Sequence, residues 1–246
     1  MWNADKIVYR NDDSFVRAYQ GSELVWEKSS SNNKIFYTST DGQIVTPDIG
    51  TGEESKGFGA NIVSNTYSGG RGVIVFDGPV TKIGYTAFGR CNTLQTIVIP
   101  DSITSIGSYA FSYCTSLTTI TIPDSITSIG QLTFYGCTSL TSITIPNSVK
   151  RIDIGVFERC TSLISITIPV SVRDIKYNAF KDCNQLSEVI VNTVTPPELY
   201  PEQYTGIYNQ FENNAPGRKI KVPAESLQVY KTKIGWSDYA DDIIAQ

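Results

Sequence analysis

The residues of this chain best suited to metal or redox chemistry are five cysteines that recur at one interval. Each follows the previous one after 23 residues, and the series is Cys91, Cys114, Cys137, Cys160 and Cys183. Zinc sites usually take two ligands from a close C-x-x-C pair, which this spacing lacks. An odd number of thiols also cannot pair completely as disulfides. We therefore expect a buried column of small apolar side chains and no metal site.

Pairs of carboxylates offer a second kind of chemistry. Glu53 and Glu54 are adjacent in a glycine-rich stretch, and Asp241 and Asp242 are adjacent near the end of the sequence. Glycoside hydrolysis needs two carboxyl groups that face each other across a cleft. Adjacent side chains in loops are usually only solvated, so these pairs predict no catalytic centre.

Nucleophilic and phosphate-binding patterns are also missing. Residues 57–59 and 69–72 are glycine-rich, but neither stretch has the spacing of a phosphate-binding loop, so both are interpreted as turns. Histidine is absent, which excludes Ser-His and Cys-His nucleophile pairs. We expect a protein that is not an enzyme and that holds no cofactor. A glycan-active enzyme remains an alternative, confined to residues 34–78 or 195–215.

The composition restricts the classes of partner. The net charge is -4 and no run of lysine or arginine occurs, whereas a nucleic-acid-binding protein normally carries a basic stripe. No stretch reaches the roughly 18 apolar residues that a membrane-spanning helix needs, so we expect no membrane insertion. The first ten residues carry charges and no apolar run, which predicts no signal peptide in this chain.

The cysteine interval belongs to a repeat with the consensus A-F-x-x-C-x-x-L-x-x-I-x-I-P-x-S-I-x-x-I-G. Phe88, Leu94 and Pro100 begin three further series that keep the step of 23 residues. Generic amphipathicity does not hold several positions at one period over five copies. A repeat of this length predicts a solenoid, in which each unit buries its apolar side against the next unit.

The pattern within one unit predicts its local structure. In the L-x-x-I-x-I part, strand alternation turns leucine and isoleucine inward and the residues between them outward. Proline ends this strand, because it cannot donate a ladder hydrogen bond. A second extended piece follows, with Ile126 and Ile129 inward and Gly130 permitting the turn after it. We expect the A-F-x-x-C part to form a short helical turn on the outer wall.

Two units, C-T-S-L-T-T-I-T-I-P-D-S-I-T-S-I-G and C-T-S-L-T-S-I-T-I-P-N-S-V, resemble the BspA-like leucine-rich repeats of bacterial surface proteins. The resemblance covers residues 79–191. It implies a leucine-rich-repeat solenoid, curved and used for protein–protein contact or adhesion, with no catalytic residue. The predicted fold is therefore β-rich with short helical turns, and about five 23-residue repeats form a parallel sheet.

The outward residues of the predicted strands are the candidate binding face. They are hydroxyl-bearing or β-branched side chains, and they are Thr96, Val98, Thr119, Thr121, Ser142, Thr144, Ser165 and Thr167. Such residues also suit any exposed strand, so their types alone do not require a ligand. A remote alternative is an ice-binding β-solenoid, but only Thr119 and Thr121 form a complete T-x-T pair. Between Cys91 and Pro146 the charged residues are two aspartates, which favours a partner recognised without steering charges.

The flanks predict a β N-terminal module and a C-terminal cap. Residues 1–28 read as three short strands and 29–33 as a linker. Residues 34–78 read as a β-rich N-terminal cap before the repeats at 79–191. Residues 192–246 contain a tyrosine-rich insertion, a recovered I-x-I-P signature at 220–223 and a terminal helix from Ala224. The segment V-R-A-Y-Q-G-S-E-L-V-W-E resembles a short N-terminal element of phage tail and other virion proteins.

Two functional hypotheses follow. The first is a non-catalytic solenoid that binds a protein or cell-surface partner and mediates adhesion, on a bacterial surface, secreted, or in a phage particle. The alternative is a virion structural protein that assembles with copies of itself through residues 1–28, which makes a homo-oligomer possible. A stable trimer or larger ring in solution would favour the alternative, and a monomer would favour the surface domain.

Overall fold

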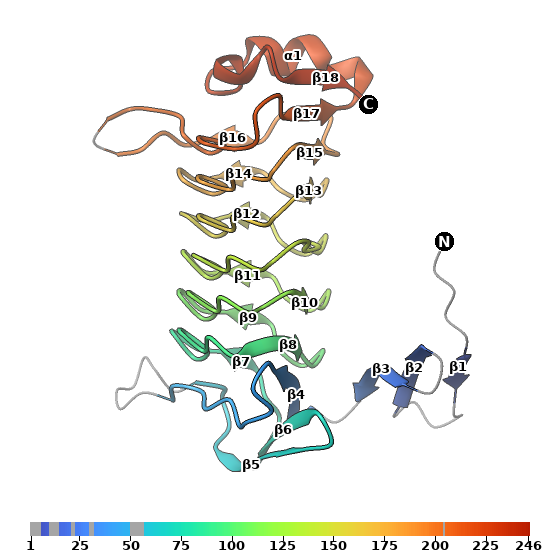
Figure 1. Cartoon of the computed structure of the whole chain (residues 1–246). Coiled ribbons are helices and arrows are strands. Elements are labelled where there is room, and N and C mark those ends of the chain that lie inside the picture. Colours follow the sequence, from blue (N-terminus) through green and yellow to red (C-terminus); the bar gives the residue numbers. More distant parts are fainter. Residues whose placement is uncertain (1–5, 10–14, 21–22, 30–31, 50–56, 204) are drawn as a thin grey trace.

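The computed structural model describes residues 6–9, 15–20, 23–29, 32–49, 57–203 and 205–246. In Figure 1 the middle and C-terminal part of the chain forms a column of stacked coils, each of which carries short strands. This arrangement confirms the predicted β-rich solenoid. The connections between the three strands predicted in residues 1–28, at 10–14 and 21–22, and the pair Glu53 and Glu54 lie outside the described residues.

The L-x-x-I-x-I segments form the first column of strands, together with the strand of the recovered I-x-I-P signature and a last strand near residue 246. Their bounds are β8 (Leu94–Val98), β10 (Thr119–Thr121), β13 (Ser165–Ile168), β15 (Glu188–Val191), β17 (Lys219–Val222) and β18 (Ile243–Ala245). Neighbours pair in parallel with one register, so Thr119 lies opposite Thr96 and Ser165 opposite Glu188. The coil between β10 and β13 forms no strand, and it joins the next coil through a bridge from Thr144 to Thr167 and a hydrogen bond from the N–H of Ile164 to the carbonyl of Thr141. Among the described residues the column therefore consists of two sheets.

A second column of two-residue strands runs along another side of the coils. It comprises β7 (Lys82–Ile83), β9 (Ser105–Ile106), β11 (Ser128–Ile129), β12 (Arg151–Ile152), β14 (Asp174–Ile175) and β16 (Glu198–Leu199). Paired neighbours among these strands are also parallel, and the second residue of each strand, isoleucine in five and Leu199 in β16, is buried. They are the second extended piece that the repeat predicts.

The A-F-x-x-C segments form turns, where the sequence predicted short helical turns. Residues in the left-handed conformation, such as Tyr109 with φ 58° and Tyr113 with φ 57°, interrupt the helical course of the backbone. Alternate amides of the segment bond the next coil: the N–H of Phe111 donates to the carbonyl of Thr133 at 2.9 Å, whereas the N–H of Ser112 closes a turn to the carbonyl of Tyr109 at 3.0 Å. The turns thus form a third hydrogen-bonded ladder between coils.

A stack of phenylalanine rings runs through the core. Adjacent centroids lie 5.3 to 5.6 Å apart and the ring planes agree within 10° along the series Phe88, Phe111, Phe134, Phe157, Phe180 and Phe211. Phe58 closes one end with an edge contact at 5.7 Å. Trp236 and Tyr239 close the other end, with centroids 6.1 and 5.3 Å from that of Phe211.

The glycine that recurs at the turn of several repeats allows adjacent coils to pack closely. A Cβ atom added to Gly130 would lie 2.4 Å from the backbone nitrogen of Ser108, and one added to Gly107 would lie 2.8 Å from the carbonyl carbon of Gly84. The sequence predicted that these glycines permit a turn. The positive φ angles instead occur two residues later, at Leu132 and its counterparts. At Gly107 and Gly130 the adjacent backbones leave no room for a side chain, whereas the equivalent positions of the next two coils hold Asp153 and Lys176.

The two ends of the column are closed differently. At the N-terminal end, β4 (Lys34–Ser39), β5 (Ile62–Ser68) and β6 (Arg71–Phe76) form antiparallel strands that continue the first column in the order β10-β8-β4-β6-β5. At the C-terminal end, the 3₁₀ helices Ala224–Ser226 and Trp236–Tyr239 flank α1 (Leu227–Thr232). Figure 1 shows these helices above β17 and β18.

The N-terminal strands form a separate antiparallel sheet. It consists of β1 (Lys6–Tyr9), β2 (Phe15–Gln20) and β3 (Glu23–Ser29), with β2 in the middle. Three strands were predicted in residues 1–28. The boundaries proposed for the five segments of the chain stay predictions.

We predict that Phe134→Ala lowers the free energy of unfolding by about 3–5 kcal/mol, because the ring is buried between two stacked neighbours. Thr141→Ala, at an exposed position of the same coil, is the matched control and should change it by less than about 0.5 kcal/mol. Urea unfolding followed by circular dichroism measures both. Equal effects of the two substitutions would contradict the ring stack as a source of stability.

Candidate interaction face

The structure brings the eight predicted face residues together in two rows on the outward side of the first column. One row contains Thr96, Thr119, Ser142 and Ser165, and the other contains Val98, Thr121, Thr144 and Thr167. Five of them are exposed, and Thr96, Val98 and Ser165 are half-buried. Their placement agrees with strand alternation, while their role in binding stays a prediction.

The N-terminal cap adds an apolar part to the same face. Phe36 on β4 lies in register with Val98 on one side and with Val73 on the other, and Lys34 lies in register with Val75. Residues directly opposite each other across a ladder present their side chains on the same face. Phe36, Val73, Val75 and Val98 therefore form one half-buried cluster, which we call the apolar patch.

Polar contacts frame the apolar patch. The guanidinium carbon of Arg71 lies 4.7 Å from the centroid of the Phe36 ring, a cation–π distance. The hydroxyls of Thr38 and Thr96 lie 2.8 Å apart and hydrogen bond to each other. The two rows of predicted face residues, which we call the hydroxyl rows, therefore begin directly beside the patch, and the two surfaces are continuous.

Sequence reasoning missed the apolar patch. The alternation in β4 and β6 is visible in the sequence and would have turned Phe36 and Val73 outward. What the sequence does not show is that β4 pairs antiparallel with the first repeat strand. That pairing decides that the cap extends the candidate face.

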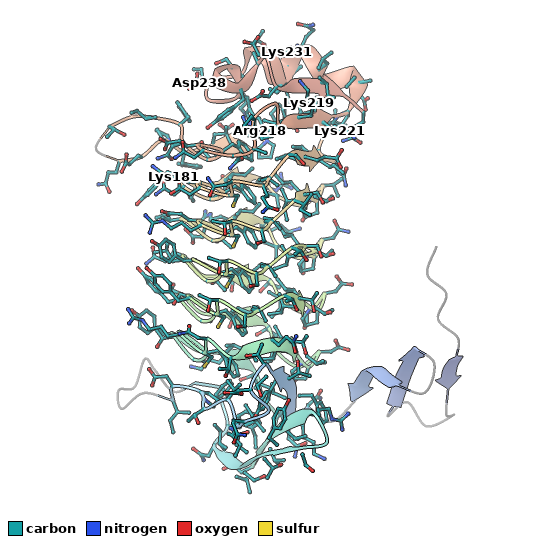
Figure 2. The ribbon with its side chains drawn as sticks, in the orientation of Figure 1. Lys181, Arg218, Lys219, Lys221, Lys231 and Asp238 are labelled. Atoms are coloured by element: carbon teal, nitrogen blue, oxygen red, sulfur yellow. The ribbon has the colours of Figure 1, made fainter. Side chains whose placement is uncertain are left out.

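Charged side chains mark the C-terminal end of the same face. The row that contains Ser165 continues to Glu188 and Lys219, and the row that contains Thr167 continues to Lys221. The amino group of Lys221 pairs with the carboxylate of Glu188 at 2.5 Å, and both side chains are partly exposed. Figure 2 shows Lys219 and Lys221 at this end of the stack. The second row passes through Ile190 and ends at the exposed Ile244, so the face changes along the column from apolar to hydroxyl-bearing to a mixture of charged and apolar residues.

Tyrosines of the outer wall pack in pairs. The rings of Tyr85 and Tyr109 lie 5.6 Å apart edge to face, and those of Tyr113 and Tyr135 lie 5.0 Å apart. Arginines cover the second pair, with Arg90 over Tyr113 and Arg159 over Tyr135, each at 5.6 Å. Tyr85 remains 50% exposed and Tyr113 40% exposed. The two pairs therefore combine partial exposure with ring packing, which suits both interface anchors and cover for the repeat core.

The cysteines line up inside the core, as expected from their spacing. All five are free thiols, and four are buried while Cys91 is half-buried. Each buried thiol donates to the phenylalanine carbonyl of the preceding coil, as Cys137 does to Phe111 at 3.1 Å. The sulfur–oxygen distances of the four bonds run from 3.0 to 3.2 Å. The thiol is therefore a buried hydrogen-bond donor as well as a small apolar group.

Burial also suppresses the acidity of these thiols. It raises the pKa of Cys137 and of Cys183 to about 12, and that of Cys91 to about 11 with a smaller contribution from the carboxylate of Asp48. The thiolate is the form that attacks electrophiles and binds metals, so a raised pKa keeps the thiolate fraction of these groups small at neutral pH and slows their reactions.

The other candidate residues have structural contacts. Asp242 forms an ion pair with the buried Arg218. Gly69 and Gly70, with φ 57° and 79°, form the turn between β5 and β6. The carbonyl of Gly57 accepts a hydrogen bond from the N–H of Gly84 at 2.5 Å. Within the described residues no three His, Cys, Asp or Glu side chains gather in a metal-like group. No helix of that part of the chain is both long and apolar enough to cross a bilayer.

Comparison with known families identifies the repeat. The sequence model of the BspA type leucine-rich repeat region matches residues 74–196 in six copies, which is half of the chain. The chain belongs to the BspA-type leucine-rich repeat family. The sequence resemblance is thereby confirmed, and the count of six copies exceeds the expected five by one.

Solved structures of other leucine-rich repeat proteins are similar to this BspA-type chain. A leucine-rich repeat protein of T. pallidum is 34% identical, with 59% of this chain and 67% of that chain covered and a TM-score of 0.49. A leucine-rich cell surface protein of Faecalibacterium prausnitzii is 29% identical, with 52% and 31% covered and a TM-score of 0.44. The chain thus spans less than a third of the length of the second. Curated proteins gave no match.

We predict that one thiol per BspA-type chain reacts with Ellman's reagent while the protein is folded, and that this thiol is Cys91. Because its pKa is raised to about 11, the thiolate fraction and the rate should rise about tenfold per pH unit between pH 7 and 9. The four buried thiols should react only after denaturant is added. Cys91→Ser is the control and should abolish the native reaction; rapid reaction of several thiols in the folded protein would contradict the buried column.

Proposed function

We propose that this chain is a non-catalytic binding protein whose outward sheet face docks a protein partner, as an adhesion module at a bacterial surface. One observation carries the proposal: the apolar patch shares one sheet with the face residues of β8 and β10, and the two rows of hydroxyl-bearing residues continue from there onto the following coils. Membership of the BspA-type family is consistent with a protein-binding role. Adhesion and a surface location are what the family resemblance implies.

The chemistry of the face suits a protein interface. Binding energy in such interfaces concentrates in a few aromatic and arginine side chains, surrounded by contacts that exclude water. Phe36, with Arg71 on its ring, is the side chain of this kind on the face. The threonine and serine rows beside it add hydroxyl and methyl contacts at a small entropic cost, because β-branched side chains on a strand have few rotamers. Phe36 would therefore anchor the partner and the rows would extend the contact.

The distribution of charge on the face favours a partner that is recognised without strong electrostatic attraction. The apolar patch and the hydroxyl rows from β8 to β13 contain no ionised residue, and Lys34, Arg71, Glu188, Lys219 and Lys221 lie toward the two ends. Uncharged surfaces gain little from electrostatic steering, so association would be slower and weakly dependent on salt. The charged groups at the ends would instead fix the direction in which an elongated partner lies.

The hydroxyl rows are less suited to ordering water as ice. Ice-binding arrays need a regular, flat lattice of T-x-T pairs. Here one coil has the complete pair, and pairing along the column is interrupted between β10 and Thr144. The geometry therefore favours a protein partner.

We predict that peptides selected from a displayed random library on the intact chain bind through this face. Phe36→Ala should raise the dissociation constants of the selected peptides about tenfold or more, because an aromatic anchor of an interface contributes at least that much to affinity. Thr144→Arg places a bulky charge in the middle of the rows and should weaken the binding of the peptides as well. Biolayer interferometry measures the dissociation constants.

Thr127→Arg is the matched control, since Thr127 is equally exposed but precedes a strand of the second column. It should leave the affinities within about twofold of the unsubstituted chain. Circular dichroism verifies that each variant is folded. Selected peptides that bind all three variants as well as the unsubstituted chain would refute the proposed face.

A further inference from the structure

The sheet that carries the candidate face has one long edge strand, β5. It lies at the end of the order β10-β8-β4-β6-β5, and it pairs only with β6 within the described part of the chain. Its seven residues, I-V-S-N-T-Y-S, include no charged side chain and no proline. None of them is fully buried, and Val63 is 65% exposed. Charges and prolines are the usual means by which proteins prevent an edge strand from pairing.

The turn between β5 and β6 determines which backbone groups face outward. Ser68 and Arg71 close a two-residue loop whose glycines both have positive φ, which is a type I′ turn. The closing pair exchanges hydrogen bonds, and such pairs alternate along an antiparallel ladder. Ser68, Thr66 and Ser64 therefore bond β6. Asn65 and Tyr67 direct their N–H and C=O groups away from the sheet.

The opposite end of the column is protected. β18 has only three residues, and α1 packs against it. On β5, a shift of register between Ile62 and Ser64 disrupts the strand near its start. The five residues from Ser64 to Ser68 remain as a regular edge. The structure thus combines one closed end with one edge that can accept another strand.

We propose that β5 pairs antiparallel with β5 of a second copy of this chain, about a two-fold axis at Thr66. This register uses all five residues of the regular edge. Asn65 of each copy would exchange two hydrogen bonds with Tyr67 of the other, which satisfies the four outward groups of each strand. Thr66 would face Thr66 of the second copy, a favourable cross-strand pair.

A second copy is the occupant that the chemistry of the edge favours. An antiparallel strand pair is self-complementary about a two-fold axis, so one surface serves both partners. Because β5 has no charge, two copies of it do not repel each other, although each chain carries a net charge of -4. A charged partner segment would find no opposite charge on this strand.

Pairing of this kind would join the two candidate faces. Thr66 lies in register with Val73, which lies in register with Phe36. The apolar patches of both copies would then flank the two-fold axis on one continuous sheet. The inference does not depend on the proposed function, because strand pairing can be measured without any ligand of the face.

The test uses charge at the two-fold position. Sedimentation equilibrium of the intact chain, up to about 100 µM, should show a monomer–dimer equilibrium. Thr66→Lys and Thr66→Glu each place like charges directly opposite and should raise the dimer dissociation constant about tenfold or more. An equimolar mixture of the two variants should dimerise again, because opposite charges then meet. Thr127→Lys is the control and should leave the dimer unchanged.

A second variant locates the contact. In the proposed register the two Thr66 side chains form a pair that does not exchange hydrogen bonds, with Cβ atoms about 4.5–5.5 Å apart. Thr66→Cys should therefore form an intermolecular disulfide under mild oxidation, and Thr127→Cys should not. A monomer at all concentrations would overturn the proposal. So would a dimer or larger assembly that Thr66→Lys leaves intact, which would point to a different contact such as the sheet of β1 to β3.

Discussion

Each coil of this protein is too thin to enclose a core of its own, so its apolar side chains are buried only by the coils on either side. The phenylalanine stack is the clearest expression of this constraint, with ring planes within 10° of each other from Phe88 to Phe211. Burial of apolar area and dispersion between rings both act across coil boundaries. Stability in such an array is the sum of many neighbour contacts, and the two end coils need other elements to cover them.

The same constraint orders the polar groups. Backbone amides that a thin coil cannot satisfy internally bond the next coil, in two strand columns and in the ladder of turns. Side chains also form hydrogen bonds between coils. The thiol of Cys114 donates to the carbonyl of Phe88, and the hydroxyl of Ser125 donates to the carbonyl of Ile103. The carbonyl of Phe88 also accepts the N–H of Cys91, so the thiol supplies its second hydrogen bond, and the same pair of bonds recurs in the following coils.

Stacking also decides what the protein offers to partners. Inward positions are committed to the neighbouring coils, so variation in function is left to the outward positions of the strands and to the two ends. The outward face gains its apolar patch because the N-terminal cap continues the sheet with antiparallel strands. The cap that covers the core at that end also exposes the edge of β5. The candidate face and the candidate edge are thus two consequences of one way of closing the solenoid.

Much of this arrangement could be predicted from the spacing of residues. The 23-residue step of cysteine and phenylalanine predicts a stack, and strand alternation predicts which threonines point outward. Three features could not be predicted in this way. Phe211 continues the ring stack but follows Phe180 at a longer interval, because the tyrosine-rich insertion lies between them. The register of β4 on β8 is set by tertiary pairing, so the apolar patch could not be predicted from the sequence. Left-handed residues such as Tyr113 interrupt the expected helical turn. Gly136 and Gly155 hold equivalent positions in later coils, but the tyrosine and leucine at these positions in other coils do not predict a positive φ.

The positions of the five cysteine sulfur atoms in a crystal test the central claim most directly, and anomalous scattering from sulfur can locate them. Stacked coils predict a single row of peaks, with successive sulfurs about 4.8 Å apart, the spacing of neighbouring strands. Peaks dispersed through the molecule, or separated by distances unlike the strand spacing, would contradict the account.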